Sequence, residues 1–324
     1  MCGNILLLMP DFFDYPKMII DELQSRCINV DYICNESDIY RAEYSRRKNF
    51  IYRNLIHFFP FMRIIATKRA EKAVTQWYNK QLSTIKDNYD YIICIKGDMF
   101  PEKHYSFLRH KYQKSTFILY QWDDLSLLVK TRHTKWFNQK LSYNIDDCKR
   151  KGFKYLPMFS QTYLTENDIA KKYDIAIIGT IDYAHEKRLR IIEKIYNKYK
   201  ETFSFYLYLY RQDDIKTLLP TYNTKLSFED YIKVLQSSKC IVDIALINQH
   251  GPTTRFNDAL GTKTKVITTN KYIKSYPIFS DNILIIDENN PTIDKKFVTD
   301  PYCNNNLEFM SIKRWCNTIL GITK

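Results

Sequence analysis

Short apolar runs rich in β-branched and aromatic residues alternate with longer mixed polar and apolar segments along the whole chain. The short runs predict buried strands, and the longer segments, whose apolar residues recur at helical spacing, predict helices. Parallel strands need a long crossover connection, which is usually a helix. The alternation therefore predicts an α/β protein built on parallel sheets.

The first half of the chain predicts one doubly wound, Rossmann-like domain over residues 1–157. Its strand candidates are residues 5–9, 30–34, 91–96, 116–120, 140–143 and 154–156. Its helix candidates are residues 16–26, 50–85, 101–111 and 145–151. Pro157 ends the last strand candidate, and the polar stretch after it marks the predicted domain boundary.

The same alternation restarts in the second half and predicts another Rossmann-like domain over residues 158–307. Its strand candidates are residues 174–178, 203–210, 240–244, 265–269 and 282–286, and its helix candidates are 186–199, 228–236 and 254–260. A last amphipathic helix is predicted over 311–320. From topology, we expect the C-terminal segment 308–324 to pack back on the first domain.

Composition agrees with a reduced, globular, cytoplasmic protein. The 324 residues suit two domains, and 45% hydrophobic with 26% charged residues argues against disorder. The eight cysteines form no Cys-x-x-Cys pair and the six histidines are dispersed, so no structural metal is expected. The apolar run at residues 4–9 stops at Pro10, which is too early for a signal peptide or a membrane span.

The net charge of +13 includes a basic segment at residues 41–72 with only two acids. Its basic residues are Arg41, Arg46, Arg47, Lys48, Arg53, Arg63, Lys68, Arg69 and Lys72. Interleaved aromatic residues make this segment suitable for peripheral contact with an anionic membrane. Nucleic acid is the rival partner, and a solvated helix face with core aromatics is the third interpretation.

One turn in the second half has the layout of an anion site. The strand candidate 240–244 leads into residues 249–255, which contain Gly, Pro, two Thr and an Arg before a short helix begins. Free N–H groups at a helix start attract phosphate, Thr253 and Thr254 can donate hydroxyl groups, and Arg255 can bind a diphosphate. We interpret the turn as part of a nucleotide-diphosphate pocket. The alternative is an ordinary strand-to-helix turn with a surface arginine.

Ligands of open α/β sheets bind beyond the carboxyl ends of the strands. In the first half, Asp14, Asp98 and Asp123 follow three strand candidates. In the second half, Gly179 and Thr180 end a strand candidate, and Arg188 lies on the following helix. The strand ends of the first half therefore carry carboxylates, and those of the second half carry phosphate-binding groups.

With these residues, the chain resembles glycosyltransferases of the GT-B fold, in particular the bacterial capsule and lipopolysaccharide enzymes related to the CgeB-like group. The strongest stretch spans residues 238–270, and weaker matches lie elsewhere along most of the chain. The matches in the strong stretch are Ser238, Lys239, Asp243, Ile244, Gln249, Gly251, Thr253, Arg255, Ala259, Leu260, Gly261, Lys265, Ile267, Thr268, Thr269 and Asn270.

The resemblance implies two Rossmann-like domains facing a cleft, with a nucleotide-diphosphate sugar, usually UDP-linked, on the C-terminal domain. It implies an acceptor on the N-terminal domain, for which the candidates are Lys96, Gly97 and Trp122. Asp258 stands where many relatives have a glutamate that binds ribose. Retaining members often show a Glu-x7-Glu pair, and His250 occupies its first position, which favours inversion.

The candidate donor-site residues are Gly179, Thr180, Arg188, Gln249, Gly251, Thr253, Thr254, Arg255, Asp258 and Asn270. The candidates for stabilising the leaving diphosphate are Arg255, Thr253, Thr254 and Arg188. For the proton of the acceptor hydroxyl, Asp123 is the first candidate base, followed by Asp98 and Asp14. Helix-capping and turn roles are the alternatives for these acids.

The resulting hypothesis is a glycosyltransferase that requires no cofactor or metal, since GT-B enzymes neutralise the diphosphate with helix ends and cations and the chain has no Asp-x-Asp triplet. It would transfer a sugar, with inversion, to a surface-polysaccharide or lipopolysaccharide acceptor at the inner face of the cytoplasmic membrane. The alternatives are a sugar epimerase or polyol-phosphate transferase on the same fold, and then a non-catalytic nucleic-acid binder.

Overall fold

The computed structural model describes residues 3–36, 60–128, 131–160, 169–246, 249–304 and 306–322. Its contacts divide the chain into a first unit, Met1–Leu141, and a second unit, Ser142–Lys324. This division falls inside the strand β5, whereas the predicted boundary at residue 157 follows β6, the last strand of the first sheet.

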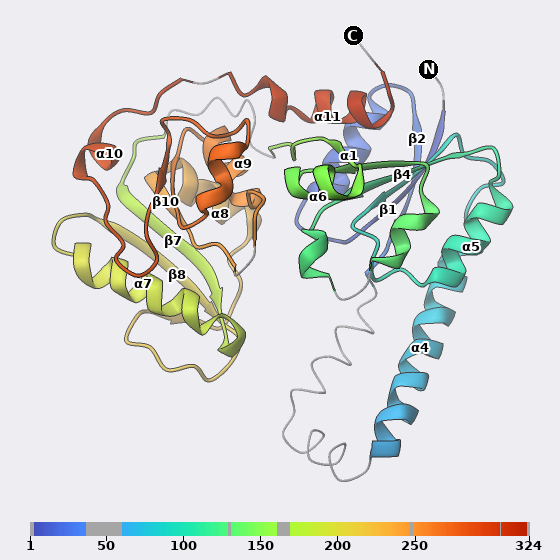
Figure 1. The fold of residues 1–324 in the computed structure, drawn as a ribbon, viewed down its shortest axis with the longest axis horizontal. Helices are drawn as coiled ribbons and strands as arrows, with labels where there is room; N and C mark the ends of the chain where they lie inside the picture. The colour runs from blue at the N-terminus through green and yellow to red at the C-terminus, as the bar shows by residue number, and fades with distance from the viewer. Residues whose placement is uncertain are drawn as a thin grey trace. The chain divides into compact units, whose positions relative to one another are not determined.

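The first sheet has six strands in the order β2-β1-β3-β4-β5-β6 (Figure 1). The strands are β1 Asn4–Met9, β2 Asn29–Cys34, β3 Tyr91–Ile95, β4 Thr116–Gln121, β5 Gln139–Ser142 and β6 Lys154–Tyr155. The connecting helices are α1 Tyr15–Gln24, α4 Pro60–Leu82, α5 Glu102–Lys111 and α6 Ile145–Lys151, with 3-10 turns η1 Leu125–Leu127 and η2 Arg132–Trp136. β1 pairs in parallel with β2 and β3, and β3 with β4.

The second sheet also has six strands, in the order β12-β11-β10-β7-β8-β9. The strands are β7 Tyr173–Ile181, β8 Phe205–Arg211, β9 Thr221–Tyr222, β10 Ser238–Asp243, β11 Lys265–Thr268 and β12 Ile283–Ile285. The helices are α7 Glu186–Tyr199, α8 Phe228–Gln236, α9 Thr254–Gly261, α10 Lys295–Thr299 and α11 Ile312–Ile319, with 3-10 turns η3 Tyr183–His185, η4 Lys271–Ser275 and η5 Glu308–Met310. The predicted class, two α/β units with parallel sheets, is confirmed.

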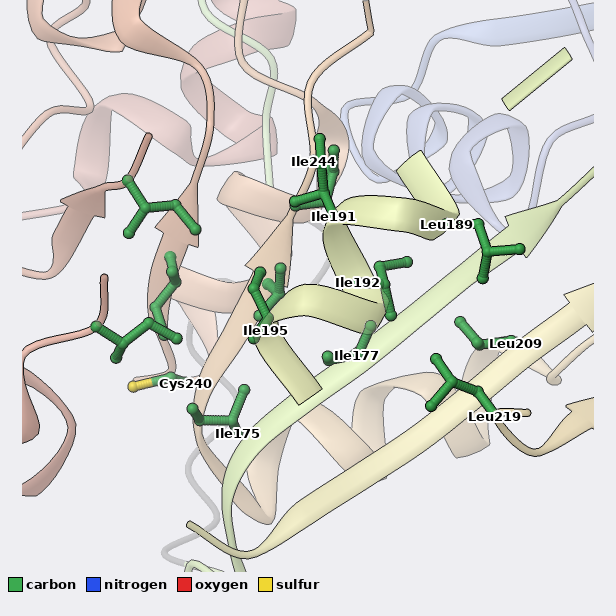
Figure 2. Packing of buried hydrophobic residues seen from close by; sticks show 14 of the residues in the cluster. Ile175, Ile177, Leu189, Ile191, Ile192, Ile195, Leu209, Leu219, Cys240 and Ile244 are labelled. Carbon is green, nitrogen blue, oxygen red and sulfur yellow. The ribbon is translucent and has the colours of Figure 1, made fainter. Parts of the chain in front are cut away.

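The core of the second unit forms because α7 is amphipathic. Its apolar residues Leu189, Ile192 and Ile195 are buried, whereas Arg190 on the same helix is exposed. Figure 2 shows Ile192 and Ile195 against the apolar side chains of β7, among them Ile177. Each such side chain contributes about 1.5–3 kcal/mol on full burial, which fixes the helix on the sheet.

Polar residues at the helix ends explain why several boundaries agree with the sequence pattern. The side chain of Asn144 accepts hydrogen bonds from the N–H groups of Asp146 and Asp147 at the start of α6. Gly152 ends α6 with a φ of 69°, a left-handed conformation that favours glycine. Ser227 caps α8 in the same way as Asn144 caps α6.

Three details go beyond the sequence pattern. β9 has two residues, Thr221–Tyr222, and was not predicted because so short a strand has no period to recognise. The helix predicted over 50–85 is described from Pro60 to Leu82, and residues 50–59 lie outside the described ranges. α11 groups with the second unit, where Trp315 contacts Phe159, and its packing on the first domain stays a prediction.

Candidate functional site

The turn at residues 249–255, called the donor turn here, is held from inside by Asp243. This carboxylate ends β10 and is 1% exposed. Its Oδ1 accepts a hydrogen bond from Thr253 Oγ1 at 2.9 Å and pairs with Arg255 Nη1 at 2.9 Å. Arg255 Nη2 donates to the carbonyl of Ile178 on β7 at 3.0 Å. The guanidinium group of Arg255 therefore ties together the ends of two neighbouring strands.

Arg188 lies near this ion pair but is not part of it. Among the described residues it makes no hydrogen bond or ion pair. Burial lowers the pKa of Arg188, and the positive charge of Arg255 lowers it further, while Asp243 and Asp182 act in the opposite direction. An arginine remains protonated under such conditions, because its reference pKa is so high. Arg188 is therefore a partly buried cation that is available to an anion.

The start of α9 adds backbone donors beside this cation. Thr253 is the N-cap residue, yet its side chain makes no capping bond, because its hydroxyl group donates to Asp243 instead. The hydroxyl group of Thr254 makes no hydrogen bond with any described residue. N–H groups of a first helical turn have no partner within the helix, and they attract anions. The Phe256 N–H donates to the Thr253 carbonyl at 3.1 Å, so the uncapped donors that α9 presents at the donor turn are the N–H groups of Thr254 and Arg255.

The glycines of the predicted donor site have different roles. Gly179 lies in β7, and a Cβ atom there would meet nothing within 4 Å. At Gly251 a Cβ atom would lie 2.3 Å from a ring carbon of Tyr143. Gly251 is thus required for close packing against Tyr143, whereas Gly179 borders open space.

Asn270 and Gln249 fix the shape of the donor turn. The Nδ2 group of Asn270 donates to the carbonyls of His250 and Gly251, each at 3.2 Å. The side-chain oxygen of Gln249 accepts from the N–H of Leu246 at 3.0 Å. Both side chains also line a cavity of about 350 Å³ beside the ends of β10, β11 and β12. Other residues that line it include Lys187, Lys271, Tyr272 and Glu288.

Asp258, the candidate ribose ligand, is 3% exposed. Tyr231 on α8 lies within hydrogen-bonding reach of its carboxylate. Burial, followed by the negative charge of Asp258, raises the pKa of Tyr231 well above its usual range. The Asp258 carboxylate therefore faces the interior of the second unit, and its contact with ribose stays a prediction.

His250 contacts two residues that the sequence did not connect with it. Its Nδ1 atom pairs with a carboxylate oxygen of Asp146 on α6, and its ring lies 4.0 Å from that of Tyr272. The carboxylate fixes the orientation of the imidazole ring, as in other His-carboxylate pairs. No spacing in the sequence signals this contact, because more than a hundred residues separate the partners.

In the first unit, Lys96 stands at the centre of an ion-pair cluster. Its Nζ atom lies 2.5 Å from Glu36 Oε1 and 3.3 Å from Asp123 Oδ2. Burial alone lowers the pKa of Lys96, but the charges of Asp123 and Glu36 outweigh burial and hold it above its usual value. Lys96 has a φ of 69°, which is uncommon for a residue with a side chain.

The neighbouring Gly97 also has a positive φ, of 82°. A Cβ atom at Gly97 would lie 2.5 Å from Tyr105 Oη and 2.7 Å from Cys94 Sγ. Tyr105 Oη donates to the Gly97 carbonyl at 2.8 Å, which holds this turn against α5. Gly97 therefore shapes the loop that presents Lys96.

A small cavity of about 180 Å³, called the rim cavity here, opens at this cluster. Its apolar wall consists of Met9, Pro10, Phe12 and Trp122, and its polar floor of Glu36, Lys96 and Asp123. The rim cavity therefore joins the carboxyl ends of β1, β2, β3 and β4, where the sequence places ligand-binding residues. Glu36 was not predicted, although its place two residues after the end of β2 is the kind of signal that identifies the other acids.

The three candidate bases have different surroundings. Asp123 lines the rim cavity and pairs with Lys96. Burial raises the pKa of Asp98, while Lys96 opposes the rise, and Asp98 Oδ1 has no hydrogen-bond partner among the described residues. Asp14 is exposed at the start of α1 and does not line the rim cavity. The structure thus groups Asp123 and Asp98 around Lys96, and it leaves Asp14 outside this cluster.

No candidate metal centre lies within the described ranges. They contain no group of three His, Cys, Asp or Glu side chains suited to holding a metal ion. The expectation that the chain works without a metal stays a prediction.

Comparisons with known proteins add evidence on the fold. No protein-family model and no curated protein matches the sequence. A putative UDP-N-acetylglucosamine 2-epimerase from Listeria monocytogenes is similar in structure, with a TM-score of 0.52 and 7% identity over 99% of this chain and 96% of that one. The glycotransferase of kitacinnamycin reaches 0.47 with 11% identity over 99% of both chains. The glycosyltransferase SnogD from Streptomyces nogalater reaches 0.46 with 9% identity over 98% and 96%.

Identities this low show the fold alone. With its two parallel six-stranded sheets, the chain has the two-unit α/β fold of the GT-B class. The bacterial surface-polysaccharide subgroup stays a prediction, as does the arrangement of the two domains around a cleft.

Proposed function

We propose that the chain is a glycosyltransferase that transfers a sugar from a UDP-linked donor to a surface-polysaccharide or lipopolysaccharide acceptor. One observation carries this proposal. Arg188, a cation without a hydrogen-bond partner in the described ranges, lies beside the Arg255–Asp243 pair and the uncapped start of α9. Such an arrangement suits a diphosphate, because cations and N–H groups neutralise its charge together.

In the proposed reaction, the acceptor hydroxyl attacks the anomeric carbon of the donor sugar. The bond between that carbon and the diphosphate oxygen breaks, and the electron pair leaves with the nucleotide. Arg188, Thr254 and the first N–H groups of α9 stabilise this growing charge, and Arg255 holds the donor turn in place. These groups supply the charge stabilisation that a metal ion supplies in other transferases.

The proton of the acceptor hydroxyl goes to a carboxylate in the proposed inverting mechanism. Asp123 suits this role best because it lines the rim cavity and its carboxylate lies 3.3 Å from Lys96 Nζ. Asp98 is less suitable, since it does not line the rim cavity; burial raises its pKa. Asp14 lies outside the rim cavity at the start of α1, where its side chain makes no capping hydrogen bond.

We also propose peripheral contact with an anionic membrane through α4 and the segment before it. The exposed side chains on α4 include Ile64 at 58% and Ile65 at 45%, together with Lys68, Arg69 and Lys72. Apolar and basic side chains on one exposed helix fit a lipid surface. None of the helices in the described ranges is long and apolar enough to cross a membrane. Residues 41–59 of the predicted basic segment lie outside those ranges.

The proposal is tested first by binding and then by turnover. We expect UDP to bind the full chain in isothermal titration calorimetry, and radiolabelled UDP-sugars to be incorporated into product when a membrane lipid extract is present. An epimerase would change the donor sugar without any acceptor, so product analysis separates the two enzymes. Absence of binding by every nucleotide sugar would remove the transferase proposal. Salt-sensitive DNA binding that survives Arg188→Ala would instead favour the nucleic-acid binder.

A further inference from the structure

The start of α6, within the second unit, contacts two consecutive residues of the donor turn. The carboxylate of Asp146, in the first turn of α6, pairs with His250 Nδ1. The ring of Tyr143, just before α6, packs so closely on Gly251 that a Cβ atom there would lie 2.3 Å from a ring carbon. His250 and Gly251 are therefore fixed by side chains that lie more than a hundred residues earlier in the chain.

The same two residues are held through their backbone by the buried side chain of Asn270. Its Nδ2 group donates to the carbonyls of both His250 and Gly251. Its side-chain oxygen accepts from the Tyr272 N–H at 3.0 Å, which fixes Asn270 at the start of η4. Asn270 thus holds the carbonyls of this part of the donor turn, and the start of α6 holds the imidazole and the glycine Cα.

α6 also has an anchor outside the donor turn. Tyr276, which directly follows η4 and is 4% exposed, donates from its hydroxyl group to Asn144 Oδ1 at 3.3 Å. The same hydroxyl oxygen accepts from the Ile145 N–H at 3.3 Å. Asn144 in turn caps α6. This anchor keeps the start of α6 in place when Asp146 is replaced, so such a variant changes the donor turn selectively.

Order at the beginning of the donor turn affects its end, where α9 begins. Asp243 holds that end through Thr253 and Arg255. The uncapped N–H groups of Thr254 and Arg255, which suit a diphosphate, follow directly. A ligand binds more tightly to a loop that is already ordered, because binding then does not have to supply the entropy of ordering it. Contacts that fix residues 250 and 251 therefore contribute to the affinity for an anion at α9.

We propose that Asp146 and Tyr143 are positioning residues that order the beginning of the donor turn, and that UDP binds more tightly because of this order. The effect on UDP rests on the proposed transferase function. The ordering of the turn does not, because it depends only on contacts within the second unit.

Asp146→Ala in the full chain tests the first positioning residue. Without nucleotide, hydrogen–deuterium exchange of the donor-turn N–H groups should become about threefold to tenfold faster. The affinity for UDP, measured by calorimetry, should fall by about the same factor. Asp146→Asn should restore most of both, because an amide oxygen also accepts a hydrogen bond from His250 Nδ1. Lys149→Ala, at an exposed position of the same helix, should change neither.

Gly251→Ala tests the Tyr143 contact without changing any charge. The added methyl group meets the Tyr143 ring, so we expect faster exchange of the donor turn and weaker UDP binding. Tyr143→Val in the same chain removes the ring atoms in the way and should restore much of both. If the methyl group itself blocks the nucleotide, Tyr143→Val restores nothing, and Tyr143 has no positioning role.

The inference is wrong if Asp146→Ala leaves the exchange of the donor turn unchanged, or if faster exchange leaves the UDP affinity unchanged. It is also wrong if exchange rises equally throughout the second unit, since the pair with His250 is then a packing contact only. If exchange rises in the donor turn alone and the natural chain binds no UDP, the donor proposal fails and the ordering of the turn by α6 stands.

Discussion

At the residue scale, Arg255 is the best example of a side chain whose role depends on what it contacts. The sequence suggested that its planar guanidinium group binds a diphosphate directly. In the structure, its two Nη groups are engaged by Asp243 and by the Ile178 carbonyl. Arg255 therefore maintains the donor turn, and Arg188 becomes the better candidate for direct contact with the donor.

Replacing Arg255 by alanine should destabilise the second unit. The change leaves Asp243, which is 1% exposed, without its cation, and breaking a buried pair typically costs about 3–5 kcal/mol. Because the Arg255 side chain is one-quarter exposed, we expect a loss of about 3 kcal/mol in the free energy of unfolding, measured by urea denaturation. Arg190→Ala, in an exposed pair with Glu186, should cost below about 0.5 kcal/mol. Equal urea midpoints for Arg255→Ala and Arg190→Ala would contradict the structural role of Arg255.

Replacing Arg188 by alanine should weaken UDP binding without lowering the free energy of unfolding. It removes a partly buried cation that repels Arg255, so the free energy of unfolding should stay constant or rise. Affinity for UDP should fall by about tenfold to a hundredfold, because one preorganised charge-stabilising group is lost. Calorimetric titration of UDP into both arginine variants measures this, again with Arg190→Ala as the control. Unchanged affinity in Arg188→Ala would exclude this residue from the donor site.

At the element scale, buried histidines fix two helical segments of the first unit. His133 in η2 is 4% exposed and its Nε2 atom lies 3.1 Å from Gln121 Oε1 on β4, while His104 in α5 lies 3.0 Å from Asn79 of α4. Burial lowers the pKa of each histidine from 6.5 to about 4. Both side chains therefore stay neutral in the folded protein at neutral pH.

The lowered pKa values of these two histidines predict that the first unit loses stability in acid. Because the folded pKa lies below the unfolded value, the contribution to stability is present above pH 6.5 and is lost as the pH falls toward 4. For His133 the free energy of unfolding should fall by up to about 3 kcal/mol over that range. Urea denaturation at pH 7 and pH 4.5 should show a smaller drop for His133→Asn than for the natural chain. His110→Asn, at an exposed position of α5, should leave the drop unchanged.

How much the sequence predicts depends on how local the cause is. α6, α7 and α8 begin and end at the predicted residues, since their caps and amphipathic periods lie within the segment itself. The rim of acids in the first unit was predicted from strand ends, but Glu36 was not. The partners of Arg255 and His250 were also not predicted, because each contact joins residues that only the folded chain brings together.

At the scale of the whole molecule, the two sheets repeat one architecture with different chemistry at their strand ends. The first unit gathers carboxylates around Lys96, and the second gathers cations and helix N–H groups around Asp243. A shared fold thus specifies where a ligand binds, while the few residues after each strand specify which ligand.

The N-terminal part of α4 is the surface through which we expect the protein to contact an anionic membrane. Figure 1 shows the N-terminal part of α4 extending away from the first sheet, and its exposed side chains include Ile64, Ile65, Lys68 and Arg69. Each basic residue near anionic headgroups contributes about 1 kcal/mol. Lys68→Glu with Arg69→Glu should therefore lower the affinity for phosphatidylserine-containing vesicles at least about thirtyfold in a sedimentation assay.

The matched control is Lys149→Glu with Arg150→Glu, which changes the net charge equally at exposed positions of α6. If α4 contacts lipid, only the α4 variant is released, and the natural chain is released as salt screens the attraction. Ile64→Ser with Ile65→Ser should weaken binding as well, because a lipid surface also buries apolar side chains, whereas binding to DNA would not depend on these two residues. Equal release of both charge variants would show that net charge alone, and not this helix, determines membrane affinity.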